Sequence, residues 1–325
     1  MADDYQQHLA GLHAKLQTPD AVILAALAEV SPSRVVARRR IVEGEANEAH
    51  AFRLADGLEL VMRIARNARG FENERWAIEA CAREGVPVPQ VLLIRRFETE
   101  AGPIDICIQR KLPGELLSNR LGLPRETLHA LTRQAGELLS RVHRVRTTGL
   151  GYIDGHGVGP FADFEALMAD FLGQAAAYAD LAARHALDPT LVARAFTVIE
   201  AAVRDAAPVR TCLIHNDFLP KHLLVHDGQI TGLIDFGEVS GESPVMEFVK
   251  WDYLVGDALP LAWLREGYAD QSLFDEGYAR LFPALGLMTS LCLLAWYDGE
   301  GFAAGVATAK ARLLRDVARL GRSET

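Results

Sequence analysis

The stretch LIHNDFLPKHLLVHDGQITGLIDFGE, residues 213–238, decides the fold. Apolar segments with the composition of strands flank a polar loop that contains His215, Asp217 and His222, and a later strand ends at Asp235. An Asp-Gly pair between the last two strands predicts a tight hairpin. We therefore expect two carboxylates, Asp217 and Asp235, to converge on one loop region.

This combination of residues suits phosphoryl transfer. That reaction needs a carboxylate to accept the proton of the attacking hydroxyl, and further hard ligands to hold magnesium against the phosphates. Taken singly, each Asp is more simply read as a turn cap and each His as a packed side chain. Taken together, in this order, they favour a catalytic loop.

The segment resembles the catalytic and metal-binding core of the aminoglycoside phosphotransferase family, whose members are relatives of protein kinases. The family pattern is HGD, four residues, Asn, a hairpin, and then IDF or IDW followed by Gly. The chain matches at His215, Asp217 and the IDFG that begins at Ile234. It departs at Asn216, where Gly is usual, and at His222, where Asn is usual. Macrolide kinases and one branch of the aminoglycoside kinases also place His there. The resemblance covers residues 35–251.

The resemblance implies roles for these side chains. Asp217 would be the catalytic base, Asp235 the principal Mg²⁺ ligand and His222 the second ligand. Because imidazole nitrogen is a softer donor than an amide oxygen, a site with His222 would also suit Mn²⁺. A purely structural His222 is the alternative.

Two other residues of the loop have less defined roles. His215 is expected to fix the loop through hydrogen bonds to backbone, with direct participation in the chemistry as the alternative. Lys221 has two equal interpretations, contact with a phosphate or exposure to water.

A nucleotide site is expected before this segment. Kinases hold the triphosphate with a cation on the third strand and a Glu on the following helix. In LVMRIARNARGFENERWAIEA the matching residues are Arg63 and Glu74. For Glu74 the alternative is an exposed position on the helix.

Weaker signals complete the nucleotide site. The turn in EGEANEAHAF resembles the family's nucleotide-covering turn, with Gly44 and Asn47 at the usual places. The backbone from Gln109 to Lys111 is expected to face the purine, because kinases bind the base there.

The remaining patterns define the fold class, α+β. Short extended segments with one helix precede LPGE, residues 112–115, and helical patterns dominate after it. With the resemblance, this implies a protein-kinase-like fold with a small antiparallel-sheet N-lobe and a mainly helical C-lobe. We expect residues 1–112 to form a helical cap and the nucleotide lobe, and residues 113–325 to form the catalytic and substrate lobe.

Composition limits the possible partners. The chain has 325 residues and a formal charge of −9, which argues against nucleic-acid binding. Four scattered cysteines without CxxC spacing indicate free thiols in a reducing cytoplasm. The acidic start does not resemble a signal peptide. The apolar run from Leu281 to Tyr297 is shorter than the roughly 20 residues of a membrane span, and it predicts a buried helix.

The leading hypothesis is a kinase that transfers the γ-phosphoryl group of ATP or GTP to a hydroxyl of an aminoglycoside, a macrolide or a similar polar metabolite. The alternative is a catalytically weakened, kinase-like nucleotide-binding protein. Acids after the catalytic segment either attract ammonium groups or lie on solvated helices, and they include Glu242, Glu247, Asp252 and Asp298. Aromatic residues there either form an apolar acceptor wall or pack in the core, and they include Trp251, Trp263, Phe282 and Trp296.

Overall fold

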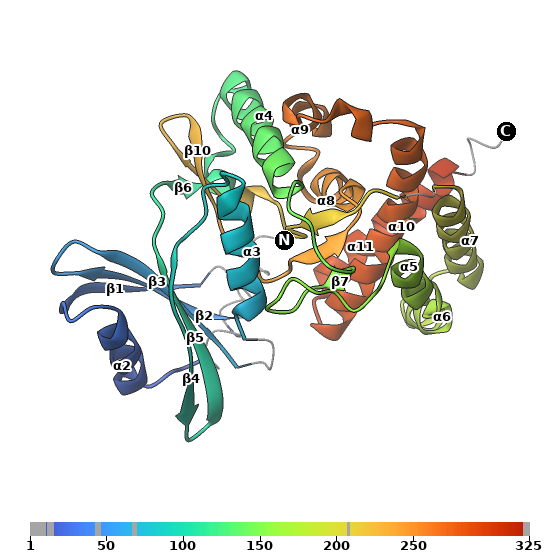
Figure 1. Ribbon diagram of the computed structural model, residues 1–325. Coiled ribbons are helices and arrows are strands. Elements are labelled where there is room, and N and C mark those ends of the chain that lie inside the picture. Colours follow the sequence, from blue (N-terminus) through green and yellow to red (C-terminus); the bar gives the residue numbers. More distant parts are fainter. Residues whose placement is uncertain (1–10, 12–15, 43–46, 67–69, 207–208, 321–325) are drawn as a thin grey trace.

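The computed structural model describes residues 11, 16–42, 47–66, 70–206 and 209–320. A five-stranded sheet with one helix packed against it lies on the left of Figure 1, most helices lie on the right, and α3 lies between them. The sheet is antiparallel throughout, in the order β1-β2-β3-β5-β4. Its strands are β1 (Val35–Ile41), β2 (Glu48–Leu54), β3 (Glu59–Ala65), β4 (Val91–Thr99) and β5 (Gly102–Arg110).

The two faces of this sheet have different roles because side chains alternate along each strand. One face packs against α2 (Asp20–Val30), and this core includes Leu60, Met62, Ile106 and Ile108. Residues of the opposite parity, Arg63 on β3 and Cys107 and Gln109 on β5, therefore lie on the other face. Strands β2 and β3 pair as a hairpin across the turn at Asp56 and Gly57.

Helix α3 (Glu72–Arg83) brings Glu74 against the sheet. The sequence predicts this helix at residues 71–84, and the structure agrees to within one residue at each end. Gly85 follows the helix in a left-handed conformation, with φ of 75°, as expected of a helix stop. The apolar face of α3, with Ala77, Ile78 and Cys81, belongs to the large core of the helical part. The helix therefore connects the sheet to the rest of the protein.

The chain leaves the five-stranded sheet at Arg110 and joins a second sheet at β6 (Glu115–Leu116). Between them, Gly114 has φ of 116°, and a Cβ there would lie 2.8 Å from the carbonyl oxygen of Val225. Glycine is required at this turn by both conformation and space. The proposed division into residues 1–112 and 113–325 stays a prediction.

The remaining residues form mainly helices. They are α4 (Arg125–Val142), α5 (Phe164–Leu172), α6 (Ala175–Arg184), α7 (Pro189–Asp205), α8 (Val245–Val255), α9 (Leu261–Gly267), α10 (Glu276–Gly299) and α11 (Ala303–Leu320). Two three-stranded sheets, β10-β9-β6 and β7-β11-β8, lie among them. Their other strands are β7 (Gly151–Tyr152), β8 (Cys212–Ile214), β9 (Leu223–His226), β10 (Gln229–Leu233) and β11 (Ser240–Glu242).

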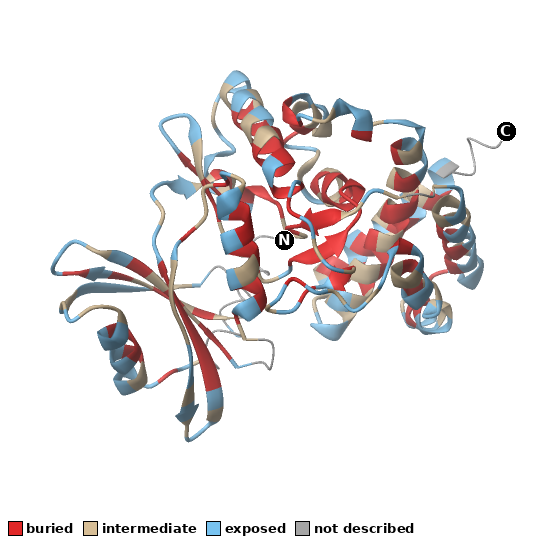
Figure 2. Cartoon of the chain, in the orientation of Figure 1, coloured by how far each residue is buried: buried red, intermediate tan, exposed pale blue. Residues whose placement is uncertain are grey.

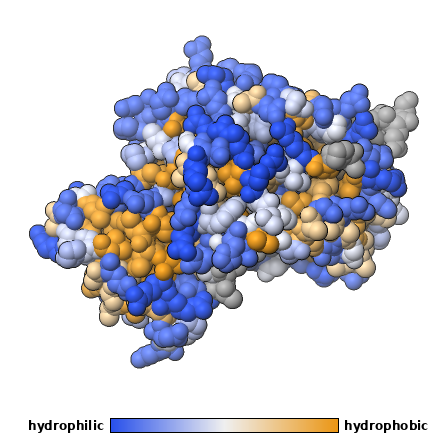
Figure 3. Space-filling model, in the orientation of Figure 1, coloured by the Kyte–Doolittle hydropathy of each residue, from blue (hydrophilic) through white to orange (hydrophobic). Residues whose placement is uncertain are grey.

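Helix α8 lies at the centre of the helical part, where buried residues concentrate in Figure 2. Its Trp251 is fully buried and donates its indole N–H to the carbonyl oxygen of Leu259 at 2.9 Å. Core packing is thus the correct interpretation of this aromatic residue. Figure 3 shows a largely hydrophilic face, with apolar residues gathered over the five-stranded sheet.

The predicted buried helix corresponds to α10. Among the described residues it is the one helix long and apolar enough to cross a membrane, and 44% of its most apolar window is buried. Leu285, Leu287, Leu291 and Leu294 are fully buried in the core of the helical part. All four cysteines are free, and Cys292 on this helix is partly exposed while the other three are buried.

Helices α4 and α9 touch at two glycines. A Cβ at Gly136 would lie 2.0 Å from the carbonyl oxygen of Leu264, and one at Gly267 would lie 1.8 Å from that of Arg133. By contrast, a Cβ at Gly286 on α10 would have no neighbouring atom within 4 Å. Backbone atoms cannot move aside as side chains do, so the contact between α4 and α9 requires glycine.

We therefore expect Gly136→Ala to lower the free energy of unfolding by about 1–3 kcal/mol, through overpacking against backbone. The matched control Gly286→Ala should raise it by up to about 1 kcal/mol, because alanine favours a helix over glycine. Urea unfolding of both variants measures the difference. Equal effects at the two positions would contradict the proposed close approach of α4 and α9.

Candidate active site

His215 anchors the loop between β8 and β9 through hydrogen bonds to other segments of the chain. This residue is fully buried, and its backbone N–H donates to Glu247 Oε2 at 2.7 Å. Its Nε2 lies 3.1 Å from the carbonyl oxygen of Ile234, and because a carbonyl only accepts, Nε2 carries the hydrogen. Burial lowers the pKa of His215, so the ring is neutral. The prediction that His215 fixes the loop through backbone contacts is confirmed.

Asp217 follows in the same loop and is partly accessible, with its side chain 24% exposed. Lys221 Nζ lies 2.8 Å from Asp217 Oδ2, and His222 Nδ1 lies 3.5 Å from the same oxygen. Burial acts to raise the pKa of Asp217, but His222 and Lys221 outweigh it, and the pKa lies below the usual value. Asp217 is therefore ionised at neutral pH and able to accept a hydrogen bond from a hydroxyl.

His222 connects this loop to Asp235. Its Nδ1 lies 2.8 Å from the carbonyl oxygen of Asp217, to which it donates a hydrogen. Its other nitrogen, Nε2, lies 3.2 Å from Asp235 Oδ2. The hydrogen bond of Nδ1 thus fixes the ring orientation, and Nε2 lies beside a carboxylate oxygen of Asp235.

Asp235 lies two residues after the end of β10 and adopts an unusual backbone conformation, with φ of 65°. Such a conformation costs free energy in a residue other than glycine, and it is often found at functional sites. Burial acts to raise the pKa of Asp235, but Arg63 and His222 outweigh it and keep the pKa far below its usual range. The carboxylate is therefore charged at every physiological pH.

Arg63 joins the sheet to this loop. Its Nη2 lies 2.8 Å from Asp235 Oδ1, and its Nη1 donates to Glu74 Oε2. The side chain of Glu74 is only 4% exposed, which excludes the alternative of an exposed helix position. Burial raises the pKa of Glu74 while Arg63 opposes the rise. The structure thus brings together five residues singled out in the sequence, from four separate segments: Arg63, Glu74, Asp217, His222 and Asp235.

The other residues predicted for the nucleotide site do not join this group of contacts. Gln109 is buried on the same face of the sheet as Arg63, whereas the Lys111 side chain is 38% exposed and pairs with Glu59 at 3.0 Å. The Lys111 backbone N–H donates to the Glu59 carbonyl at 3.0 Å. Asn47 directly precedes β2, and Gly44 lies outside the described residues. Roles for these four residues stay predictions.

Comparisons with known proteins agree with this geometry. The model of the phosphotransferase enzyme family matches residues 37–282. The chain belongs to this phosphotransferase family. The resemblance found in the sequence is thereby confirmed.

Individual relatives are distant in sequence. The chain is 28% identical to hygromycin-B 4-O-kinase of Escherichia coli over 208 residues, which cover 61% of this chain and only 57% of that relative. The structure of aminoglycoside phosphotransferase APH(4)-Ia superimposes with a TM-score of 0.73 at 23% identity, covering 92% of this chain and 99% of that one. A GDP complex of a mutant aminoglycoside 2'-phosphotransferase-IIIa gives 0.67 at 16% identity, covering 94% and 100%. The predicted kinase-like fold, with a sheet lobe and a helical lobe, is confirmed.

Two acids that the sequence suggests for solvated helices, or for a cleft that attracts ammonium groups, are instead buried. Glu247 is 1% exposed and Glu242 is 8% exposed. Glu247 supports the loop between β8 and β9 through His215, and no local sequence signal distinguishes it from a surface acid on α8. Burial raises the pKa of Glu242 to about 7, while Lys250 opposes the rise and Glu247 adds to it. Other acids of that group form ion pairs, such as Asp298 with Arg184 at 2.8 Å.

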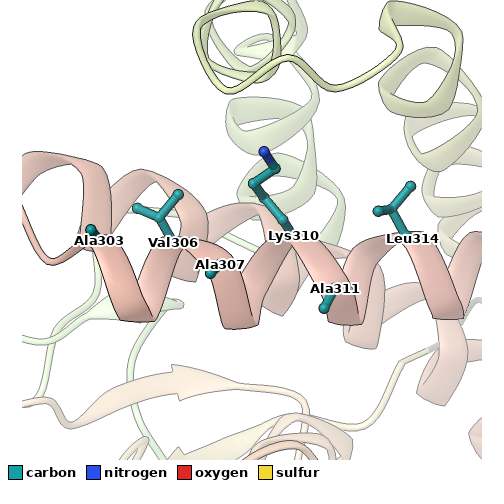
Figure 4. A pocket seen from close by; sticks show the side chains of 6 residues that line it. All are labelled: Ala303, Val306, Ala307, Lys310, Ala311 and Leu314. Atoms are coloured by element: carbon teal, nitrogen blue, oxygen red, sulfur yellow. The ribbon is translucent and has the colours of Figure 1, made fainter. Parts of the chain in front are cut away.

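Two cavities lie away from the candidate site. An open apolar groove of about 450 Å³ runs along α11, lined by Ala303, Val306, Ala307, Lys310, Ala311 and Leu314 (Figure 4). A second cavity of about 220 Å³ lies between α8, α10 and α11, beside Arg312 and Tyr253. Neither includes Asp217, His222 or Asp235. The candidate site is therefore identified from the contacts among its charged groups.

The donor set fits a divalent cation that is shared with a nucleotide. Within the described parts of the chain, no group of three or more His, Cys, Asp or Glu side chains gathers as a metal site. His222 Nε2 and Asp235 Oδ2 lie 3.2 Å apart and would be the two protein donors to such an ion. Magnesium commonly takes one or two carboxylates and completes its shell with phosphate oxygens and water. Two protein donors are thus enough for such an ion.

Glu242 makes stability depend on pH. Its folded pKa of about 7 lies above the ordinary value of 4.5, so the folded state binds this proton more tightly than the unfolded state. Stability must then fall as pH rises from about 4.5 to about 7, by about 3 kcal/mol in total. We expect Glu242→Gln to stabilise the protein relative to wild type much more at pH 8 than at pH 5.

Urea unfolding at both pH values measures this effect, and Glu300→Gln at an exposed position is the control for removal of a carboxylate. A Glu242→Gln effect that is the same at pH 5 and pH 8 would contradict a raised pKa at this residue.

Proposed function

We propose that this protein is a small-molecule kinase that transfers the γ-phosphoryl group of ATP or GTP to a hydroxyl of an antibiotic, an aminoglycoside or macrolide, or of a similar polar metabolite. The observation that carries this proposal is the convergence of Arg63, Glu74, Asp217, His222 and Asp235 through contacts of 3.5 Å or less. Membership of the phosphotransferase family supports it independently.

In the proposed reaction, Asp217 is the base. Its carboxylate accepts the proton of the acceptor hydroxyl while the hydroxyl oxygen forms a bond to the γ-phosphorus. The bond from that phosphorus to the β–γ bridging oxygen breaks, and the nucleoside diphosphate leaves. Lys221 Nζ lies 2.8 Å from Asp217 Oδ2. When an acceptor binds, the ammonium group must either move away from this oxygen or stay beside the bound hydroxyl.

The other residues hold the nucleotide. Arg63 is proposed to bind the α- and β-phosphates, with Glu74 holding its guanidinium on the opposite side. Asp235 and His222 would hold Mg²⁺, which neutralises charge on the phosphates when it is bound. Mn²⁺ is a candidate because His222 replaces an oxygen donor. Gly44, Asn47, Gln109 and Lys111 are proposed to line the nucleotide site.

Hygromycin B is the first acceptor to test. The curated relative is named a hygromycin-B 4-O-kinase, and a thermostable APH(4)-Ia mutant that superimposes with a TM-score of 0.72 was solved with AMP-PNP and hygromycin B. We propose a cytoplasmic enzyme whose partners are the nucleotide and this acceptor, with no nucleic-acid or membrane partner. The net charge of −9 and the free cysteines support this assignment.

A second candidate is a kinase-like protein that binds nucleotide without catalysis. It is motivated by Arg63 and His222, which stand where Lys and Asn are commoner in such enzymes. The two candidates differ in turnover, because a binding protein would hold nucleotide and phosphorylate no acceptor.

The test incubates the protein with ATP or GTP, Mg²⁺ and hygromycin B, other aminoglycosides, macrolides and small hydroxylated metabolites. We expect the mass of one acceptor to rise by about 80 Da in mass spectrometry, because phosphorylation of a hydroxyl adds the elements HPO3. Asp217→Asn should still bind nucleotide, while turnover falls by ~10²–10⁴-fold because no carboxylate accepts the proton. Asp235→Asn should lose both magnesium-dependent nucleotide binding and turnover.

Nucleotide binding without a mass gain on any acceptor would favour the binding protein. Normal turnover by Asp217→Asn with its true acceptor would remove this loop from the chemistry, and the assignment of a kinase site with it.

A further inference from the structure

Asn216, the residue before Asp217, adopts a conformation that side chains disfavour. Its φ is 67°, in the left-handed region. Asparagine tolerates this region better than most residues but still at a cost, so neighbouring groups must hold it there. The direction of the Asp217 side chain depends on that conformation, because Asn216 sets the course of the chain into Asp217.

Lys250 supplies the contact that holds Asn216. Its Nζ donates to the backbone carbonyl oxygen of Asn216 at 2.8 Å and also to the side-chain Oδ1 of the same residue. Two bonds from one ammonium to the carbonyl and the side chain fix both the peptide and the side-chain rotamer. Charge-assisted bonds of this kind are stronger than neutral ones.

Within the described part of the chain, Lys250 forms no ion pair with a carboxylate. Among the residues that the structure describes, none of the carboxylates lies within the 4.0 Å ion-pair distance of its Nζ. Glu242 acts on Lys250 through longer-range attraction, as the effect of Lys250 on the Glu242 pKa shows. The hydrogen bonds of this ammonium to protein are therefore directed to Asn216.

Helix α8 thus supports two successive residues before the candidate base. Glu247 accepts the His215 N–H at 2.7 Å, and Lys250, one turn later, binds Asn216. Both side chains come from the helix that contains the fully buried Trp251, so their positions are set by the core of the protein.

We propose that Lys250 is a positioning residue for catalysis, which holds Asn216 in the left-handed conformation and thereby directs the Asp217 carboxylate toward the acceptor. The kinetic consequence rests on the proposed kinase function, whereas the structural consequence for the loop does not. Lys250 touches neither nucleotide-binding candidate, Arg63 nor Asp235, so its removal affects turnover rather than nucleotide affinity.

The test is a double-mutant cycle, in which kcat and the nucleotide KM are measured for the wild type, Lys250→Met, Asn216→Gly and the double variant. Lys250→Met should lower kcat by about 10–100-fold, the scale of a misplaced catalytic group, with the nucleotide KM changed by less than about threefold. In the Asn216→Gly background the same substitution should lower kcat by less than about threefold, because glycine adopts the left-handed conformation without support. Lys250→Arg, which keeps a charged donor, should retain more activity than Lys250→Met.

Lys310→Met is the matched control. Lys310 is also half-buried in the helical part and also donates to a backbone carbonyl, that of His185, but it lies on α11 (Figure 4). We expect it to leave kcat unchanged. Equal losses from Lys250→Met in the two backgrounds, or a loss carried by the nucleotide KM, would overturn the proposal.

Hydrogen exchange gives a readout that needs no acceptor. Lys250→Met should speed exchange of the His215 amide, which adjoins Asn216 and donates to Glu247, by at least about tenfold through local opening, and Lys310→Met should not. A wild-type protein that phosphorylates nothing would refute the proposed function alone. Unchanged exchange in Lys250→Met would overturn the role of Lys250 whatever the activity.

Discussion

The site depends on the guanidinium of Arg63, which contacts Glu74 of α3 on one side and Asp235 of the catalytic segment on the other. This side chain is only 13% exposed, so its charge must be matched by carboxylates at close range. The sheet supplies the cation, α3 supplies one anion, and the helical part supplies the other. Loss of Arg63 would leave two carboxylates facing one another, one of them buried.

A second level of support lies beneath the catalytic loop. His215 is buried and neutral, and it ties β8 to the strand before Asp235. Glu247 on α8 accepts from its backbone, so the core of the helical part and the loop form one packed unit. These hydrogen bonds offset part of the free-energy cost of burying the polar groups of His215 and Glu247. The side chains of the candidate site residues Asp217 and Asp235 remain partly exposed.

Much of this arrangement could be predicted from the sequence, because strand and helix periodicity and the order of polar residues are local signals. The hairpin of β9 and β10 and helix α3 follow from such signals, whereas the pairing of Arg63 with Glu74 is implied by the resemblance to kinases. Strands β6, β7 and β11 could not be predicted, since two or three residues carry no periodicity and pair only through tertiary contacts. The burial of Glu242 and Glu247 is likewise a tertiary effect, and the contact of Lys250 with Asn216 spans 34 positions in the chain. The sequence around a charged residue on a helix does not predict which distant group that residue will contact.

We propose that Asp235 and His222 would hold a metal ion in the nucleotide complex, and that Arg63 would then contact the phosphates while it keeps its bond to Glu74. A crystal structure of the complex with Mg²⁺ and AMP-PNP tests this most directly. We expect Asp235 and His222 to coordinate the ion, and Arg63 to keep its bond to Glu74 while donating to an α- or β-phosphate oxygen. A complex in which Arg63 Nη2 still lies 2.8 Å from Asp235 Oδ1, with the phosphates bound elsewhere, would contradict it.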